Sequence, residues 1–289
     1  DCHHKALEIN PGYQQAHYNL GLAKQVLGRW SEATAYFKTA LDLAANQMES
    51  GVPVKRLGEL LIELDSLPII YKDGEEVEKY RKHYTACLNE AVSLAEEHKD
   101  NYTNQEKQLL KETLFRINNF YLVYQQLNDK ELQVQYCKLL AALLSPEFDV
   151  FLAPLTGQNA GANTSTKIRV GIISEHLKKH NGASWAYGWL AGLPKEHYEF
   201  VSYLVNKEPD ELTEKFAALG TYRHLIFKQD NYLNALEAIR QDRLDVLLIP
   251  DVGMSGSSKV ISLARLAPVQ CIGWGHPVTS GSQNADYYL

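Results

Sequence analysis

The chain contains 289 residues, of which 45% are hydrophobic and 22% are charged. This composition is typical of a folded protein of about two domains, and it excludes intrinsic disorder. No apolar run approaches the ~18–20 residues that a membrane-spanning helix requires, and the formal net charge of −6 disfavours nucleic acid or an anionic membrane surface as a partner.

The N-terminal residues and the cysteines indicate the cellular compartment of this protein. Asp1 to His4 lack the charged-then-apolar profile of a secretory signal, and because the chain does not start with Met we expect it to begin inside a longer gene product. The four cysteines are widely spaced and form no CxxC pair, so their spacing predicts neither a disulfide framework nor a metal site. We therefore expect a cytoplasmic protein that holds no metal.

The first 45 residues are typical of tetratricopeptide (TPR) repeats. The pattern W-x2-L-G-x2-Y…A-x3-F is followed, with substitutions at its first and fourth positions, by His17, Leu20, Gly21, Lys24, Ala33 and Phe37. In such repeats small residues let two antiparallel helices approach closely, and the concave face commonly binds peptides or proteins. We predict TPR repeats over residues 1–45, with residues 1–10 as the tail of a preceding repeat. The alternative is a purely structural helical pair.

The middle of the chain is expected to remain helical. Apolar residues keep a helical period, as from Leu57 to Leu64, but no second clean repeat is present. Pro68, the turn at 72–74 and the polar pair at 128–129 are expected to separate the helices. We predict a helical, TPR-like connecting domain over residues 46–154.

The pattern changes after residue 154. Residues 155–166 are mostly small and uncharged, which predicts a linker. Over residues 167–289, strand-like apolar runs alternate with helical patterns. We expect strands at 168–174, 200–205, 224–227, 246–250 and 269–274, and helices near 184–193, 209–219, 231–241 and 257–265. This alternation predicts an α/β, Rossmann-like domain with a parallel sheet.

Parallel sheets of this kind bind ligands beyond the carboxyl ends of their strands, where the strand order reverses. Polar loops follow three of the predicted strands, at residues 174–184, 251–258 and 275–281. The chain contains neither GxGxxG nor GxxxxGK[ST], which disfavours dinucleotide hydride transfer and P-loop phosphoryl transfer. The glycines and serines of 252–258 could present backbone amides to a phosphate, although a helix N-terminus with these residues needs no ligand.

Histidines in two of these loops are the candidate functional side chains. His180 follows the first strand, where an imidazole could orient or deprotonate an acceptor hydroxyl near neutral pH. His276 lies between Gly275 and Pro277, so the backbone can approach a ligand closely while the proline stiffens the turn. The alternatives are a solvated loop histidine at 180 and a turn histidine at 276.

Near its C-terminal end the chain contains Ala267-Pro268-Val269-Gln270, Trp274-Gly275-His276-Pro277, Thr279-Ser280-Gly281 and Asp286-Tyr287. These residues resemble the signature of the O-GlcNAc transferase and SPINDLY-type glycosyltransferases. The first strand, from Arg169 to His180, resembles the family's opening strand and catalytic-domain histidine, and TPR repeats are the family's usual companion. The helical middle is similar to a bacterial branch of the family at residues 67–71 and 119–132.

The resemblance implies the first half of a GT-B glycosyltransferase, an enzyme with two Rossmann-like halves. It implies an inverting transfer of GlcNAc or a hexose from UDP-GlcNAc or UDP-glucose to Ser or Thr, without a metal or other cofactor. The acceptor protein or peptide would bind the TPR region. In this family most contacts to the uridine and pyrophosphate come from the second half, so we expect the 289-residue chain alone to be inactive.

The resemblance also assigns roles to residues. His180 matches the family's candidate general base. The positions that match or flank the sugar-contacting loop are His276, Pro277, Thr279, Ser280 and Gly281. Where animal O-GlcNAc transferases carry Tyr, this chain has His276, and Gly-His-Pro is similar to bacterial N-glucosyltransferases that modify Asn. An N-linked transfer is therefore one alternative.

Two further alternatives belong to other functional classes. A TPR scaffold with a degenerate α/β domain would bind partners but no nucleotide sugar. A UDP-sugar epimerase of GT-B shape would share the cleft, but it has little use for a repeat array.

Overall fold

The structure is a computed structural model that describes residues 2–46, 54–155, 165–273, 275 and 278–289. The chain divides into two compact units. The first comprises Asp1–Leu127 and Lys138–Leu143, and the second comprises Asn128–Cys137 and Leu144–Leu289. Among the described residues, no helix is both long enough and apolar enough to cross a membrane.

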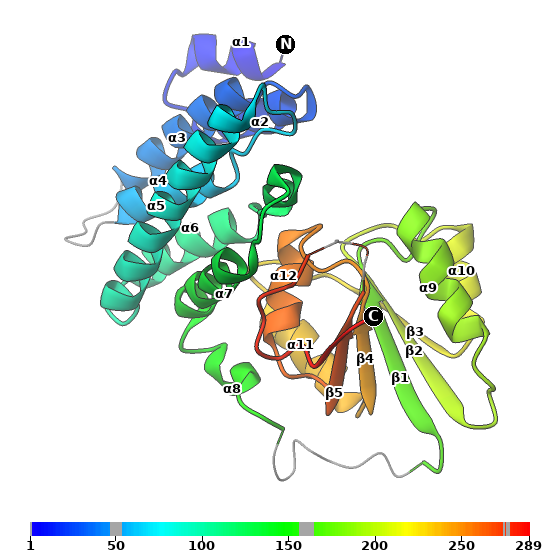
Figure 1. Cartoon of the computed structure of the whole chain (residues 1–289). Helices are drawn as coiled ribbons and strands as arrows, with labels where there is room; N and C mark the ends of the chain where they lie inside the picture. The colour runs from blue at the N-terminus through cyan, green and yellow to red at the C-terminus, as the bar shows by residue number, and fades with distance from the viewer. Residues whose placement is uncertain (1, 47–53, 156–164, 274, 276–277) are drawn as a thin grey trace. The chain divides into compact units, whose positions relative to one another are not determined.

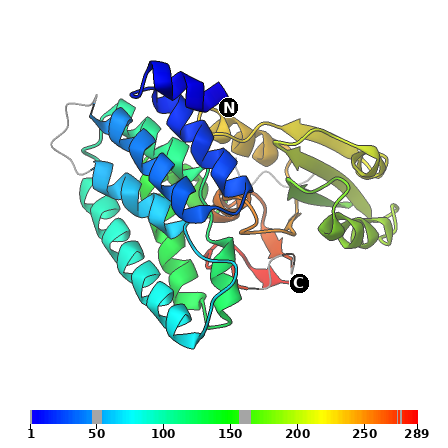
Figure 2. The ribbon, with the colours of Figure 1, turned by 90° about the horizontal axis from the view of Figure 1, so that it is seen from above.

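In the first unit, every regular element of the described residues is a helix. Its elements, in chain order, are α1 (Cys2–Ile9), α2 (Gln14–Val26), α3 (Trp30–Ala45), α4 (Val54–Leu64), α5 (Gly74–His98), α6 (Asn104–Leu114) and the 3-10 helix η1 (Phe120–Gln125). Consecutive helices from α1 to α5 pack on one another, and α6 packs on α4. Two perpendicular views show α2 to α5 side by side as a stack (Figures 1 and 2).

Helices α2 and α3 pack against each other as expected for the predicted repeat, with a small residue facing an aromatic ring. Phe37 of α3 is only 6% exposed, and its ring lies so close to Gly21 of α2 that a Cβ at Gly21 would be 2.5 Å from the Cε1 atom of Phe37. Because glycine has no side chain, the two helices can approach to this distance. The pair is TPR-like, as predicted.

Polar caps begin α5, at the predicted turn of 72–74, and α6, where no break was predicted. Asp73 caps α5 by accepting a hydrogen bond from the backbone N–H of Glu76 at 2.9 Å. Thr103 and Glu106 form a reciprocal capping box at the start of α6. These caps satisfy amides that have no partner inside the helix, so they define where each helix starts.

The second unit contains the sheet. After α7 (Lys130–Leu144) and the short α8 (Asp149–Leu152), strands and helices alternate: β1 (Ile168–Ser174), α9 (Asn181–Ala191), β2 (Tyr198–Val205), α10 (Glu211–Ala217), β3 (Thr221–Leu225), α11 (Tyr232–Gln241), β4 (Val246–Ile249), α12 (Gly256–Leu263), β5 (Val269–Ile272) and β6 (Tyr287–Tyr288). The strand order is β3-β2-β1-β4-β5-β6, and every pair is parallel. Helices α9 and α10 cover one face, and α11 and α12 the other (Figure 1). The predicted Rossmann-like parallel sheet is confirmed.

The third strand differs from its predicted position. It spans Thr221–Leu225 rather than 224–227, because the backbone of Phe227 bonds a side chain instead of a strand. Asn206 accepts a hydrogen bond from the Phe227 N–H at 2.7 Å and donates one to its carbonyl at 3.0 Å. The apolar residues that suggested a strand at 226–227 therefore belong to the following loop. The short edge strand β6 was also not predicted.

The predicted linker is only partly described, since residues 156–164 lie outside the described residues. Next to it, the Ser165 hydroxyl donates to Glu199 on β2 at 2.8 Å. The domain boundaries at 45, 154 and 166 remain predictions.

Candidate functional site

The strand order reverses between β1 and β4, and a cavity of about 310 Å³ lies at the carboxyl ends of these two strands. Its walls include residues that follow β1, begin α9 and follow β4, namely Ser174, His176, His180, Trp185, Asp251 and Met254. Carboxyl ends at a switch point are the usual ligand site of open α/β sheets. The cavity is therefore the candidate site of this unit.

His180 lies in this cavity as the N-cap of α9. Its backbone is extended, and its Nδ1 atom accepts a hydrogen bond from the N–H of Gly182 at 3.2 Å. A neutral imidazole whose Nδ1 accepts must carry its proton on Nε2. In this arrangement the Nε2–H of His180 is a donor, suited to holding an oxygen of a bound ligand.

His176 stacks on His180. Their ring centroids are 4.3 Å apart with an interplanar angle of 24°. Burial, and next the neighbouring His180, hold the pKa of His176 below its usual value. Two charged imidazolium rings at this distance would repel each other, so the lowered pKa keeps His176 neutral and able to accept a proton.

Asp251 is a buried carboxyl at the floor of the same cavity, with 4% exposure. Its Oδ2 accepts from the Ser174 hydroxyl at 2.7 Å and lies 3.8 Å from Nε2 of His176. Its Oδ1 has no hydrogen-bond partner among the described residues. Burial raises the pKa of Asp251 to about 7, against the lowering effect of Ser174. The carboxyl can therefore change its protonation state near neutral pH.

The sequence did not single out His176 or Asp251. The available signal was their position, because Asp251 follows Pro250 directly after β4 and His176 is two residues beyond the end of β1. The two residues are 75 positions apart in the chain. Only the strand order makes β1 and β4 neighbours, so this pair could not be read from local spacing.

The loop after β5 contributes Gly275 to the same cavity. The Gly275 N–H donates to the Pro250 carbonyl at 3.1 Å, and a Cβ at Gly275 would lie 2.5 Å from that oxygen. Glycine is required here because the loop passes this close to the backbone after β4. The adjacent candidates His276 and Pro277 lie outside the described residues.

Thr279 and Ser280 line a second cavity, of about 470 Å³, beside β5 and β6. Thr279 is exposed, and its hydroxyl oxygen accepts from the Gly281 N–H at 3.3 Å. His180 lines the first of these two cavities, and Thr279 and Ser280 line the second.

Ser280 and Gly281 attach this loop to the rest of the unit. The Ser280 carbonyl accepts from the buried ammonium of Lys259 on α12 at 2.5 Å and from the Cys137 thiol at 3.3 Å. Gly281 has a φ of +71°, and a Cβ there would lie 2.3 Å from the backbone carbon of Gln133. Ser280 and Gly281 thus hold the loop against α7 and α12.

The start of α12 is capped by its own side chains. Ser255 and Ser258 form a capping box, and the Ser258 hydroxyl also accepts from the Gly253 N–H at 3.2 Å. All eight residues of α12 are buried. Since its capped amides already have partners, the Gly-Ser run at 252–258 is explained without a phosphate.

No family model and no curated protein matches this chain. Among solved structures, a mutant of the O-GlcNAc transferase of Thermobaculum terrenum matches 99% of this chain, with a TM-score of 0.58 and 19% sequence identity. The two chains share a fold. This chain spans about half, 48%, of the length of that structure.

Proposed function

We propose that this chain is part of an inverting, UDP-sugar-dependent protein glycosyltransferase that transfers GlcNAc or a hexose to Ser or Thr. The observation that carries the proposal is the cavity at the β1–β4 switch point, which holds two stacked imidazoles and a buried carboxyl. The fold shared with a solved O-GlcNAc transferase supports it. The TPR-like helices would bind the acceptor polypeptide.

The chemistry requires an acceptor hydroxyl to lose its proton while its oxygen forms a bond to the anomeric carbon and the bond to UDP breaks. We assign His180 to holding the acceptor oxygen, because its Nδ1 is occupied by the Gly182 N–H and its Nε2 carries the proton. We assign His176 to accepting the proton, because its lowered pKa keeps the ring neutral. Asp251 would act as a positioning residue, holding Ser174 and the strand end beneath both rings.

We further propose that the loop at 276–281 faces the donor sugar. Thr279 supports this role because its side chain is exposed and lines a cavity. Ser280 is 3% exposed, and its carbonyl is bonded to Lys259 and Cys137, so we expect Ser280 and Gly281 to position the loop. His276 and Pro277 remain candidate sugar contacts, from the resemblance alone.

The test is sugar transfer by the complete gene product. The protein is incubated with UDP-GlcNAc or UDP-glucose and lysate proteins, and protein-bound sugar is followed by mass spectrometry. For His180→Ala and His176→Ala we expect transfer to fall by about 10²–10⁴-fold, the usual contribution of a positioned acid or base. The matched control is His224→Ala, since His224 is an exposed histidine on the edge strand β3 of the same sheet and is absent from the cavity wall.

Each outcome of this experiment tests the proposal against one of its alternatives. Transfer that survives both cavity variants would show that the cavity is not the reaction site. No transfer with either donor, in a protein that is folded, would favour the scaffold alternative. Modified Asn in place of Ser or Thr would favour the N-glucosyltransferase alternative. We expect the 289-residue chain on its own to transfer no sugar, and sustained turnover by that chain would contradict this expectation.

A further inference from the structure

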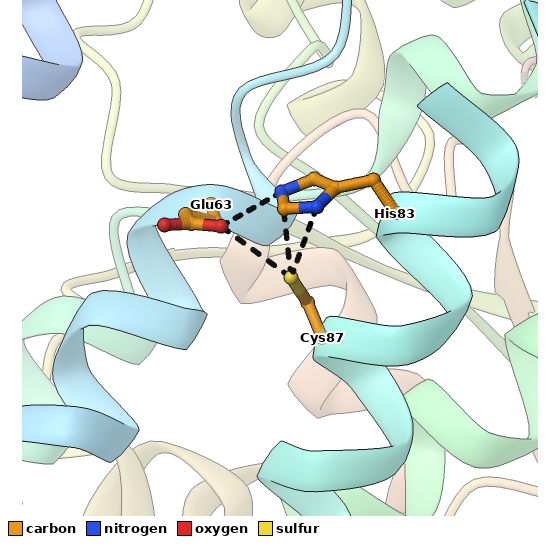
Figure 3. A group of neighbouring side chains, drawn as sticks. All are labelled: Glu63, His83 and Cys87. Carbon is orange, nitrogen blue, oxygen red and sulfur yellow. Dashed lines mark hydrogen bonds and ion pairs between the residues drawn. The ribbon is translucent and has the colours of Figure 1, made fainter. Parts of the chain in front are cut away.

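Three metal-ligating side chains converge between α4 and α5 in the first unit. Glu63 comes from α4, and His83 and Cys87 come from α5 (Figure 3). The Nε2 atom of His83 lies 2.8 Å from Oε2 of Glu63, and the Cys87 Sγ lies 3.4 Å from that oxygen and 3.5 Å from Nε2 of His83. The three potential ligand atoms lie within 4.8 Å of one another.

The two helices produce this convergence. His83 and Cys87 are four residues apart on α5, so they lie on one helix face, one turn apart. Glu63 is the next-to-last residue of α4, which packs along α5. The cysteine spacing could not reveal the cluster, because its single cysteine combines with residues of other types from two helices.

We propose that Glu63, His83 and Cys87 form a Zn²⁺ site that links α4 to α5. Around a tetrahedral zinc, a sulfur at ~2.3 Å and a nitrogen or oxygen at ~2.0 Å lie about 3.5 Å apart. The two distances from Cys87 Sγ, 3.4 and 3.5 Å, already match this value. The shorter Glu63–His83 contact of 2.8 Å has to open by roughly half an ångström as the ion takes up the shared position.

The site combines a buried soft ligand with an open side. Cys87 is 5% exposed, whereas the His83 side chain is 58% exposed, so an ion can enter from solvent past the imidazole. A water completes the fourth position, as in zinc sites with three protein ligands. Thiolate and imidazole together favour zinc over magnesium or calcium, which prefer oxygen ligands.

The neighbouring charges set the strength of the site. Lys38 of α3 donates to the other carboxylate oxygen of Glu63, Oε1, at 2.6 Å, so Oε2 is the oxygen that faces His83 and Cys87. The Lys38 ammonium opposes the positive ion, and this site offers three protein ligands, so we expect zinc to bind more weakly than at a four-ligand structural site.

The test uses zinc and cobalt as the only probes. Since Cys2, His3 and His4 are exposed and can bind metal themselves, all titrations are made in the chain with C2S, H3A and H4A. We expect one equivalent of Co²⁺ to give a near-ultraviolet thiolate-to-cobalt band that Zn²⁺ abolishes. We also expect Zn²⁺ to raise the midpoint of thermal unfolding, because it binds the native state.

Matched variants separate this site from adventitious binding. Cys87→Ser and His83→Ala should each weaken zinc binding by at least about 100-fold, and Cys87→Ser should remove the cobalt band. His98→Ala, on the same helix outside the cluster, should leave both unchanged. Circular dichroism without metal shows whether each variant is folded. Absence of a one-to-one complex, or an unchanged affinity in a folded Cys87→Ser variant, would overturn the proposal.

Discussion

At the scale of single residues, the chemistry of the cavity after β1 and β4 depends on the protonation of His176, His180 and Asp251. The Gly182 N–H donates to Nδ1 of His180, and burial lowers the pKa of His176. The Asp251 carboxyl has one oxygen bonded to Ser174 and one with no hydrogen-bond partner among the described residues. Removing water from a carboxyl disfavours its charged form, so Asp251 stays protonated in the folded state at pH values where it is ionised in the unfolded chain. This difference in protonation makes the stability depend on pH.

We predict that Asp251→Asn changes the pH dependence of stability. Burial raises the pKa of Asp251 to about 7, whereas an unfolded Asp titrates near ~3.9. Because the folded-state pKa is raised, this contribution to stability is complete below about pH 4 and is lost as pH rises to about 7. The free energy of unfolding of Asp251→Asn relative to wild type should therefore rise from pH 4 to 8, by on the order of 3–4 kcal/mol.

Urea unfolding at a series of pH values measures this difference. The lowered pKa of His176 acts in the opposite direction, because its contribution is lost as pH falls. Since His176 lies 3.8 Å from Asp251, the two proteins are compared in a His176→Ala background, where this contribution is removed from both. Exposed Asp100→Asn serves as the matched control. A difference between Asp251→Asn and wild type that is constant with pH would refute the prediction.

At the scale of secondary-structure elements, the close packing of α2 on α3 depends on the absence of a side chain at Gly21, which faces the Phe37 ring. Phe37 is held on its other sides by Tyr18, with ring centroids 5.8 Å apart, and by the Arg116 guanidinium, 4.0 Å from the ring centre. These contacts limit the movement of the ring. A larger residue at Gly21 therefore has to displace the ring or the neighbouring helix.

We predict that Gly21→Ala destabilises the first unit although alanine favours helix. The gain in helix propensity is about 1 kcal/mol, and overpacking at a buried ring costs about 1–3 kcal/mol, so the net loss is about 1 kcal/mol. Gly188→Ala, in the middle of α9 with nothing within 4 Å of its Cβ, should instead stabilise by up to about 1 kcal/mol. Urea denaturation compares the two variants, and Phe37→Leu should restore part of the loss in Gly21→Ala.

At the scale of the whole molecule, acidic residues exceed basic ones, with 35 Asp and Glu against 29 Lys and Arg. We predict that this chain binds no nucleic acid. Non-specific binders neutralise phosphates with clustered cations and reach a Kd of about 10⁻⁴–10⁻⁶ M. Fluorescence anisotropy of a labelled DNA duplex should show no saturable binding at low or physiological salt. An affinity that weakens steeply with added salt would contradict the prediction.

Much of the architecture was predictable because it depends on local periodicity. Near-continuous apolar runs such as Ile168–Ser174 and Val246–Ile249 indicate strands buried on both faces, and their alternation with helical patterns implies parallel connections. The spacing of Gly21, Ala33 and Phe37 predicts the helix pair. Where a side chain from a distant element pairs with the backbone, as Asn206 does with Phe227, the local pattern misplaces the boundary.

The sequence by itself therefore determined the order of the first five strands and of the helices between them, and it made His180, in the loop after the first strand, a candidate functional residue, since these features depend on the spacing of neighbouring residues. Only the tertiary structure decided which distant side chains meet: His176 with Asp251 across the switch point, and Glu63 with His83 and Cys87 across two helices. The physical reason is that such meetings depend on strand order and helix packing, which are set by the burial of the whole apolar surface and leave no mark at a fixed spacing along the chain.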